Sequence, residues 1–162
     1  MLFSIATTLF NGCKKDDDEK YQPKGNYGTG NGNANVTGTN TVTFTSGDWN
    51  VTAGVLYDVE ITVPGITQSI VDNGIVMVYE KSGSVECVPL PYTETNISKL
   101  FTFGVGYVDI LIESTDGTPI ANPGTVTYRV AFISAAGIKK ITDNNVDINN
   151  YSAVKQVLQI AD

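Results

Sequence analysis

The sequence contains no histidine and has little cysteine and little charge. Of its 162 residues, two are cysteine, one is tryptophan and 17% are charged. Without histidine the chain lacks the usual general base, the most common zinc ligand and the usual pH-sensitive switch. Carboxylates, hydroxyls and amides are the groups left for chemistry, and this set is more typical of a binding or structural surface than of a catalyst. We therefore expect no enzymatic activity and no cofactor.

Long apolar runs are absent as well. No run reaches the roughly 20 residues that a helix needs to span a bilayer. The hydrophobic fraction of 41% can nevertheless form a core, and the length suits one domain. The formal net charge of -7 argues against nucleic acid as a partner, because binding to phosphates depends on basic residues.

The N-terminus carries a short apolar segment followed by a cysteine. Residues 2–10 are uncharged and mostly apolar, which is typical of the central region of a signal peptide. Gly12 and Cys13 then resemble a bacterial lipobox, in which the cysteine receives a diacylglycerol and the chain is cut before it; Phe10 and Asn11 depart from that pattern. The resemblance implies a signal-peptide remnant at 1–12 and lipid attachment at Cys13, with the membrane as partner. A truncated secretory signal with an incidental cysteine is the alternative.

Two polar segments follow Cys13. The charged residues 14–20 resemble the surface-export signal of lipoproteins from the Bacteroidetes, which implies an outer-membrane, surface-exposed location; a solvated spacer is the plain alternative. The Gly- and Asn-rich residues after them are typical of a flexible linker. We interpret residues 13–38 as a lipid-anchored tether. Because residues 13–34 hold four basic and four acidic residues, the whole charge of -7 belongs to residues 35–162.

Residues 39–162 alternate between apolar and polar side chains with a period of two, which is typical of half-buried antiparallel strands. The clearest runs are 41–45, 57–63, 107–113 and 125–132. Residues 75–79 are continuously apolar, so we expect a strand that is covered on both faces. Pro89 and Pro91 place the run 85–92 at an edge or interrupt it. With turn-forming residues between the runs, the pattern predicts an all-β, antiparallel β-sandwich.

Two short helices interrupt the strand pattern. Residues 67–74 predict a helical turn with Thr67 as its N-cap. Near the end of the chain, Asn149 or Asn150 can cap a helix over residues 151–158, whose apolar side chains share one face. We expect that face to cover an open edge or end of the sandwich.

Several segments of this domain resemble a family of small Bacteroidetes surface lipoproteins. The resemblance is carried by VPGITQSIVDNGIVMVYEK at 63–81, VPLPYT at 88–93, TVTYRVAFIS at 125–134 and DINNYSAVKQVL at 147–158. Members of the family have a lipobox, often a Gly-rich segment, and a C-terminal β-sandwich. The resemblance implies this fold and this location. It implies no activity and no catalytic residues.

Aromatic residues provide the first candidate site. Trp49, the only tryptophan, lies near a predicted turn. If exposed, Trp49 could stack on sugar rings together with a tyrosine such as Tyr92; if buried, it belongs to the core.

Carboxylates on predicted strands provide the second candidate site. Asp58 and Glu60 share the outward face of one strand, roughly 6–7 Å apart, which is similar to the paired carboxylates of glycoside hydrolases. Asp109 and Glu113 repeat the pattern, as solvated strand faces commonly do. Arg129, the sole arginine, could form a cross-strand pair with Asp109.

The remaining candidates are weak. Asp143 and Asp147 lie in an oxygen-rich run and could ligate calcium, but the run lacks the glycine and glutamate of an EF-hand, and a loop with a helix cap is the simpler interpretation. Cys87 has no histidine to activate it, so we expect a free, at least partly buried thiol. A disulfide with Cys13 is excluded if Cys13 carries lipid.

The sequence therefore favours a non-enzymatic, lipid-anchored cell-surface protein. A carbohydrate- or protein-binding module or adhesin is the alternative, with a glycan or a surface protein as its partner. A carboxylate-dependent hydrolase is a second alternative.

Overall fold

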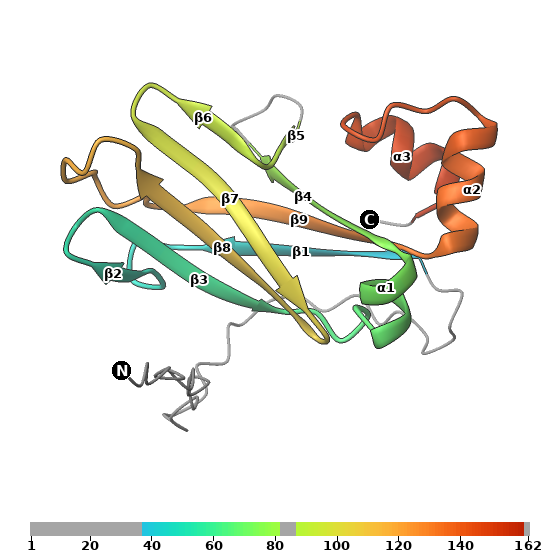
Figure 1. Cartoon of the computed structure of the whole chain (residues 1–162), viewed down its shortest axis with the longest axis horizontal. Coiled ribbons are helices and arrows are strands. Elements are labelled where there is room, and N and C mark those ends of the chain that lie inside the picture. Colours follow the sequence, from blue (N-terminus) through green and yellow to red (C-terminus); the bar gives the residue numbers. More distant parts are fainter. Residues whose placement is uncertain (1–36, 82–86, 161–162) are drawn as a thin grey trace, which may run out of the picture.

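The computed structural model describes residues 37–81 and 87–160, which form two antiparallel sheets packed face to face (Figure 1). The prediction of an all-β antiparallel sandwich with short helices is confirmed. The predicted signal-peptide remnant, Cys13 and all but the last two residues of the tether lie outside the described residues.

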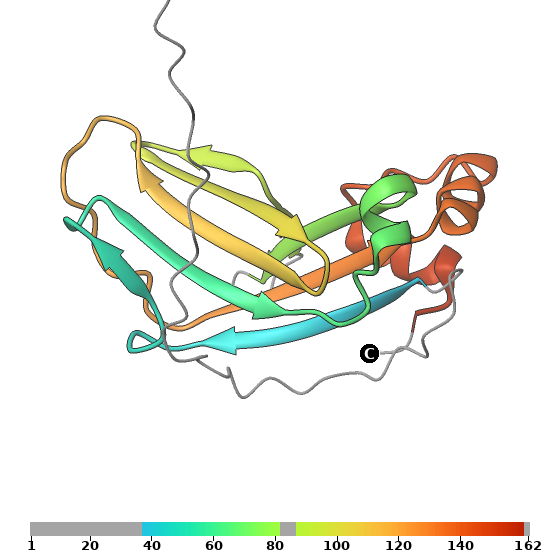
Figure 2. The ribbon, with the colours of Figure 1, turned by 60° about the horizontal axis from the view of Figure 1, so that its bottom comes forward.

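The smaller sheet has four strands in the order β1-β9-β4-β5. In that order they are β1 (Gly38–Phe44), β9 (Val126–Ile133), β4 (Ile75–Lys81) and β5 (Cys87–Pro89). The larger sheet has five strands in the order β2-β3-β8-β7-β6. They are β2 (Asn50–Thr52), β3 (Leu56–Thr62), β8 (Tyr107–Ser114), β7 (Ile97–Gly104) and β6 (Tyr92–Glu94). Figure 2 shows the two layers from the side.

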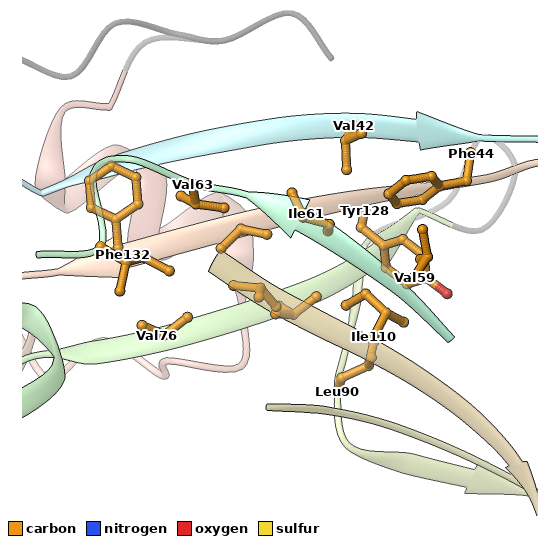
Figure 3. Close-up of a cluster of buried hydrophobic side chains, with 14 of the residues drawn as sticks. Val42, Phe44, Val59, Ile61, Val63, Val76, Leu90, Ile110, Tyr128 and Phe132 are labelled. Atoms are coloured by element: carbon orange, nitrogen blue, oxygen red, sulfur yellow. The ribbon is translucent and has the colours of Figure 1, made fainter. Parts of the chain in front are cut away.

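The core lies between the two sheets, where the alternation of the strands places every second side chain. In β3, Val59 and Ile61 are buried whereas Glu60 is exposed. Apolar side chains from both sheets meet in one layer (Figure 3). Those labelled there are Val42, Phe44, Val59, Ile61, Val63, Val76, Leu90, Ile110, Tyr128 and Phe132. Burial of this layer is the main stabilising contribution to the fold.

Prolines interrupt the run predicted over residues 85–92. The chain leaves the four-stranded sheet after Pro89, at the end of the edge strand β5, and enters the five-stranded sheet at Tyr92. Proline has no N–H to continue a ladder, so the two prolines end one strand before the next begins. Between them Leu90 is buried in the core and donates its backbone N–H to the carbonyl of Val78 at 2.8 Å.

The central strand β4 is covered on both faces, as predicted from its continuous apolar run. Val76 and Val78 point into the sandwich, whereas Tyr79 lies on the outer face and packs against Tyr151. Tyr151 opens helix α3 (Tyr151–Leu158), and the two ring centroids are 5.1 Å apart. The helix lies at one end of the sandwich (Figure 1). It covers the outer face of β4 and β9 there, so of the two predicted positions it takes the end of the sandwich and not an open edge.

The two predicted helices begin at capping side chains. The hydroxyl of Thr67 accepts a hydrogen bond from the backbone N–H of Ile70 at the start of α1 (Gln68–Asn73). Asn150, rather than Asn149, caps α3, because its side-chain oxygen accepts from the N–H of Ala153 at 3.1 Å. Such caps satisfy N–H groups that the first helical turn leaves unpaired.

A third helix, α2 (Ala135–Asp143), was not predicted. It begins directly after β9, with Ser134 as its N-cap, and contacts α3 and β9. Its sequence gives a weak helical signal, because the apolar residues Ile138 and Ile141 cover little more than one turn and Gly137 lowers helix propensity. No helix in the described part of the chain is long and apolar enough to cross a membrane.

Candidate binding face

The two outer faces of the sandwich differ in how they are covered. Helices α2 and α3 pack over the four-stranded sheet, where Ile133, Ile141 and Val154 form a second apolar cluster. On the five-stranded sheet, by contrast, none of the outward side chains of β3 and β8 is buried. Residues of these two strands that point away from the core therefore meet solvent.

Four carboxylates lie together on this open face. Asp58 and Glu60 belong to β3, and Asp109 and Glu113 belong to β8, which pairs directly with β3. The register places Glu60 directly opposite Asp109. The two carboxylate pairs that the sequence suggested as separate features thus form one surface, which we call the acidic face.

Neighbouring side chains orient two of these carboxylates. The side-chain amide of Asn50 on β2 donates to Asp58 at 3.0 Å, and the hydroxyl of Thr102 on β7 donates to Asp109 at 3.4 Å. Leu111 of β8 lies between two neighbouring strands, opposite Asp58 of β3 and opposite Leu100 of β7. Apolar side chains therefore adjoin the charged ones. The acidic face therefore combines negative charge with a small apolar area, a combination that suits a partner with basic groups.

The only basic residue in the five strands of this sheet points inward. Lys99 on β7 crosses the sandwich and places its Nζ at 2.7 and 2.9 Å from the two carboxylate oxygens of Glu80 on β4. Glu80 is buried, and the hydroxyl of Tyr128 donates to it at 3.4 Å. Lys99 therefore pairs with Glu80 inside the sandwich and does not reach the acidic face.

The burial of this ion pair changes the pKa values around it. Burial opposes the charge of Lys99, but hydrogen bonds to Glu80 and Tyr92 outweigh this effect and raise its pKa above the ordinary value. Burial, together with the charge of Glu80, raises the pKa of Tyr128 well above its usual range. Both shifts extend the protonated forms further into the alkaline range. The contacts of Lys99 and Tyr128 with Glu80 link the two sheets.

The sequence analysis missed this ion pair. The available signal was the position of Lys99, which is inward in the alternation of β7, and that of Glu80, which ends a continuous apolar run. Taken alone, Lys99 and Glu80 each resemble a charged residue at the solvated end of a strand. Their partnership depends on how the two sheets face each other, which no local pattern encodes.

Trp49 is a core residue and offers no exposed platform for a sugar ring. Its side chain is buried between Phe44 and Tyr128, with ring centroids at 5.8 and 6.4 Å, and its indole N–H donates to the carbonyl of Gly124 at 3.1 Å. Of the two interpretations of Trp49, the structure supports burial. The sugar-stacking role is corrected because both the ring and its polar edge have partners inside the protein.

Tyr92, the other candidate for sugar stacking, also lies at the core. It is half-buried, packs against the main apolar cluster and carries the Lys99 ammonium 5.3 Å from its ring centroid. This cation–π contact makes Tyr92 a member of the inter-sheet charge cluster.

The weaker candidates have local partners. Asp143 forms an exposed ion pair with Lys139 at 2.7 Å, one helical turn away. Asp147 accepts hydrogen bonds from the backbone and the side chain of Asn149. Within residues 37–81 and 87–160, no three acidic, cysteine or histidine side chains gather where they could hold a metal ion. The calcium interpretation of Asp143 and Asp147 gains no support from this arrangement.

Cys87 and Arg129 lie on the outer side of the four-stranded sheet. Cys87 is a half-buried free thiol on β5 that packs with Tyr79. The expected pair of Arg129 with Asp109 is wrong, because β9 and β8 belong to different sheets. The Arg129 guanidinium instead lies 4.9 Å from the ring centroid of Tyr151 and helps to hold α3 on the sheet.

Comparison of the chain with protein-family models, with curated proteins and with solved structures gave no significant match.

Proposed function

We propose that this protein is a non-enzymatic, lipid-anchored cell-surface protein that presents its acidic face to a partner. The location rests on the sequence, where Cys13 follows an apolar segment and precedes a charged cluster. The binding role rests on one structural observation. Four carboxylates on adjacent strands face solvent, and the only lysine of the same sheet is directed into the core.

The chemistry of the acidic face favours a partner with basic groups. Glu60 lies opposite Asp109, and Asp58 and Glu113 lie on the same two strands, so this face carries a concentration of negative charge that attracts basic groups. A surface protein with exposed lysine or arginine fits this charge better than a neutral glycan does. Of the aromatic residues considered for stacking on sugars, Trp49 is buried and Tyr92 packs half-buried against the core.

The anchor and the location are tested on whole cells. Metabolic palmitate labelling is expected to mark the wild-type protein and to be lost in Cys13→Ala. Equal labelling of both proteins would disprove lipid attachment at Cys13. For surface exposure, protease added to intact cells is expected to degrade the domain. Degradation only after lysis would place the protein on the inner side of the membrane.

The binding role is tested by neutralising the acidic face. The variant Asp58→Asn/Glu60→Gln/Asp109→Asn/Glu113→Gln is compared with Asp72→Asn/Asp143→Asn, which neutralises two carboxylates on helices. The two variants and the wild type are applied to a glycan array and to a pull-down from a cell-surface fraction, in low and in high salt. We expect a protein partner that the wild type and the helix variant retain in low salt and the face variant loses. Equal retention by all three proteins would refute a role of the acidic face in binding.

A further inference from the structure

The turn between β7 and β8 exposes apolar side chains without any charge beside them in the sequence. Residues 100–108 read LFTFGVGYV and contain no charged residue, in a chain whose net charge is -7. Two exposed apolar side chains lie together on this turn, Phe103 at 39% and Val105 at 53% exposure, whereas Val51 and Val88 are exposed singly on β2 and β5. Single exposed apolar residues are common, but a group of them marks an interaction site. We call residues 103–107 the apolar tip.

The apolar tip is held in a fixed position. The backbone N–H of Gly106 donates to the carbonyl of Ile66 at 2.8 Å, and the N–H of Val63 donates to the carbonyl of Gly106 at 2.7 Å. The ring of Phe103 stacks on that of Phe101, which packs against the core, with the ring centroids 6.3 Å apart. Because these groups are already ordered, covering the tip with a partner costs little conformational entropy.

Tyr107 lies at the base of the tip, on the outward side of β8. It pairs with Gly104, and a Cβ on that glycine would lie 2.5 Å from the nearest ring atom of Tyr107, so the ring lies across the glycine. A tyrosine has an apolar ring and a hydroxyl that binds water. Tyrosine beside apolar side chains is therefore typical of the boundary between lipid tails and water.

The apolar tip also lies near the point where the chain enters the sandwich. Tyr107 is opposite Thr62, at the end of β3, and the side chain of Asn40 donates to the carbonyl of Thr62 at 3.2 Å. Asn40 is two residues from Gly38, where β1 begins. In Figures 1 and 2 the β7–β8 turn lies beside the segment that joins β3 to α1. The residues that precede β1 therefore meet the domain at the end that carries the tip.

We propose that the apolar tip inserts into the surface of the membrane to which this protein is anchored. The inference rests on the proposed function for the anchor at Cys13, and it adds a second contact with the same membrane. Residues 14–36 separate Cys13 from the described part of the chain. A Gly-rich chain of that length spans about 25–30 Å on average. The tip would thus meet the bilayer at a high effective concentration, so that a weak apolar contact is sufficient.

The size and charge of this region favour a lipid surface over a protein. A stable protein interface buries roughly 800 Å² on each partner, whereas shallow insertion beside a lipid anchor needs only a few apolar side chains. The acidic face begins two residues after Tyr107, at Asp109, and would be repelled by anionic lipids. The partner that fits is therefore a zwitterionic bilayer, such as one of phosphatidylcholine.

A tryptophan introduced into the tip measures its depth in the bilayer. The variant Val105→Trp is compared with Val51→Trp, because Val51 has a similar exposure of 57% but lies at the other end of the β3–β8 ladder. Trp49 is buried and gives the same background in both proteins. The full chain is purified from the membrane fraction and reconstituted into phosphatidylcholine vesicles, or is added to them if it is recovered in solution. Quenching by lipids brominated on their acyl chains is then measured.

We expect the fluorescence of Val105→Trp to be quenched by the brominated lipid at least about threefold more strongly than that of Val51→Trp. Adding Phe103→Ser to Val105→Trp should reduce this quenching about twofold, because one of the two inserted side chains is lost. Circular dichroism and thermal unfolding verify that each variant is folded.

Equal quenching of the two introduced tryptophans would overturn the proposal. An emission of Val105→Trp that shifts to shorter wavelength without quenching would also overturn it, and would place a protein or a second copy of the chain on the tip. Palmitate labelling of the same preparations separates this inference from the anchor. Quenching at position 105 in unlabelled protein supports the tip and contradicts the anchor, whereas labelled protein with equal quenching at both positions retains the anchor and refutes insertion of the tip.

Discussion

The Nζ of Lys99 lies 2.7 Å from a carboxylate oxygen of Glu80, and this contact joins the two sheets from inside the sandwich. The side chains are 19% and 10% exposed, so each ion depends on the other for most of its solvation. A buried pair of this kind adds little net stability over an apolar pair, but the loss of one partner leaves an uncompensated charge.

Removing one member of this pair should therefore destabilise the domain strongly. We expect Lys99→Met to lower the free energy of unfolding by about 3 kcal/mol, measured by urea denaturation. Glu80→Gln/Lys99→Met should recover most of the loss, because glutamine is neutral and still accepts from Tyr128. Lys139→Met, which breaks an exposed pair with Asp143, should cost less than about 1 kcal/mol. Equal costs for both lysines would mean that the pair is solvated.

Stability should also fall at alkaline pH. Burial, and then the charge of Glu80, raises the pKa of Tyr128 from its ordinary value of 10.0. The folded protein thus keeps a proton that the unfolded chain releases. The stabilising contribution is complete below pH about 10 and is lost above it, by up to about 1.4 kcal/mol per pH unit for each such group. Tyr79 and Lys99, whose pKa values are also raised, act in the same direction.

Tyr128→Phe tests this linkage. Chemical denaturation of the variant and the wild type is compared from pH about 8 to about 11. The variant should lose less stability per pH unit above pH about 10, because it lacks the titrating hydroxyl. Parallel curves for the two proteins would show that the Tyr128 hydroxyl does not titrate differently in the folded and unfolded states.

Two glycines make room for the ring of Phe132. A Cβ at Gly65 or at Gly38 would collide with this ring, which lies at the end of the core. We expect Gly65→Ala to lower the free energy of unfolding by about 1–3 kcal/mol, because the buried ring of Phe132 would have to shift. Gly47→Ala is the control, since its Cβ would meet nothing within 4 Å. In a double-mutant cycle, Phe132→Leu should reduce the cost of Gly65→Ala, and strict additivity would exclude the clash.

The buried position of Trp49 predicts its response to substitution and to ligands. Trp49→Ala should cost about 3–5 kcal/mol, because it leaves a cavity beside Phe44 and Tyr128. As the only tryptophan, Trp49 also reports on its surroundings by fluorescence. Its emission should be that of a buried indole and should not change when sugars are added. A saturable change with a sugar would instead support the stacking role.

Local pattern was sufficient for most of the fold. The alternation of apolar and polar residues located the strands, because the pleat sends every second side chain to the same face. The continuous run at 75–79 predicted the doubly covered strand. Thr67, and either Asn149 or Asn150, marked helix starts, because such side chains accept hydrogen bonds from free N–H groups. Helix α2 was missed, since its short amphipathic pattern is stabilised mainly by contacts with α3 and β9.

The candidate site depended on pairings that no single strand shows. The sequence suggested Asp58, Glu60, Asp109 and Glu113 in two separate pairs, and the register of β3 with β8 brought them onto one surface. It proposed Asp109 as the partner of Arg129, but the strand order separates them. Sequence order alone does not show which strands become neighbours, because connections in a sandwich also join strands of different sheets.

The sequence by itself determined the positions of the long strands, most of the inward and outward side chains on them, the excess of negative charge in the folded part and the absence of histidine chemistry. Only the tertiary structure decided that Trp49 and Tyr92 join the core, that Lys99 turns inward to Glu80, and that the β7–β8 turn lies near the start of β1. The first group follows from local geometry and composition. The second follows from how two sheets stack and which strand ends meet, which is a property of the whole chain.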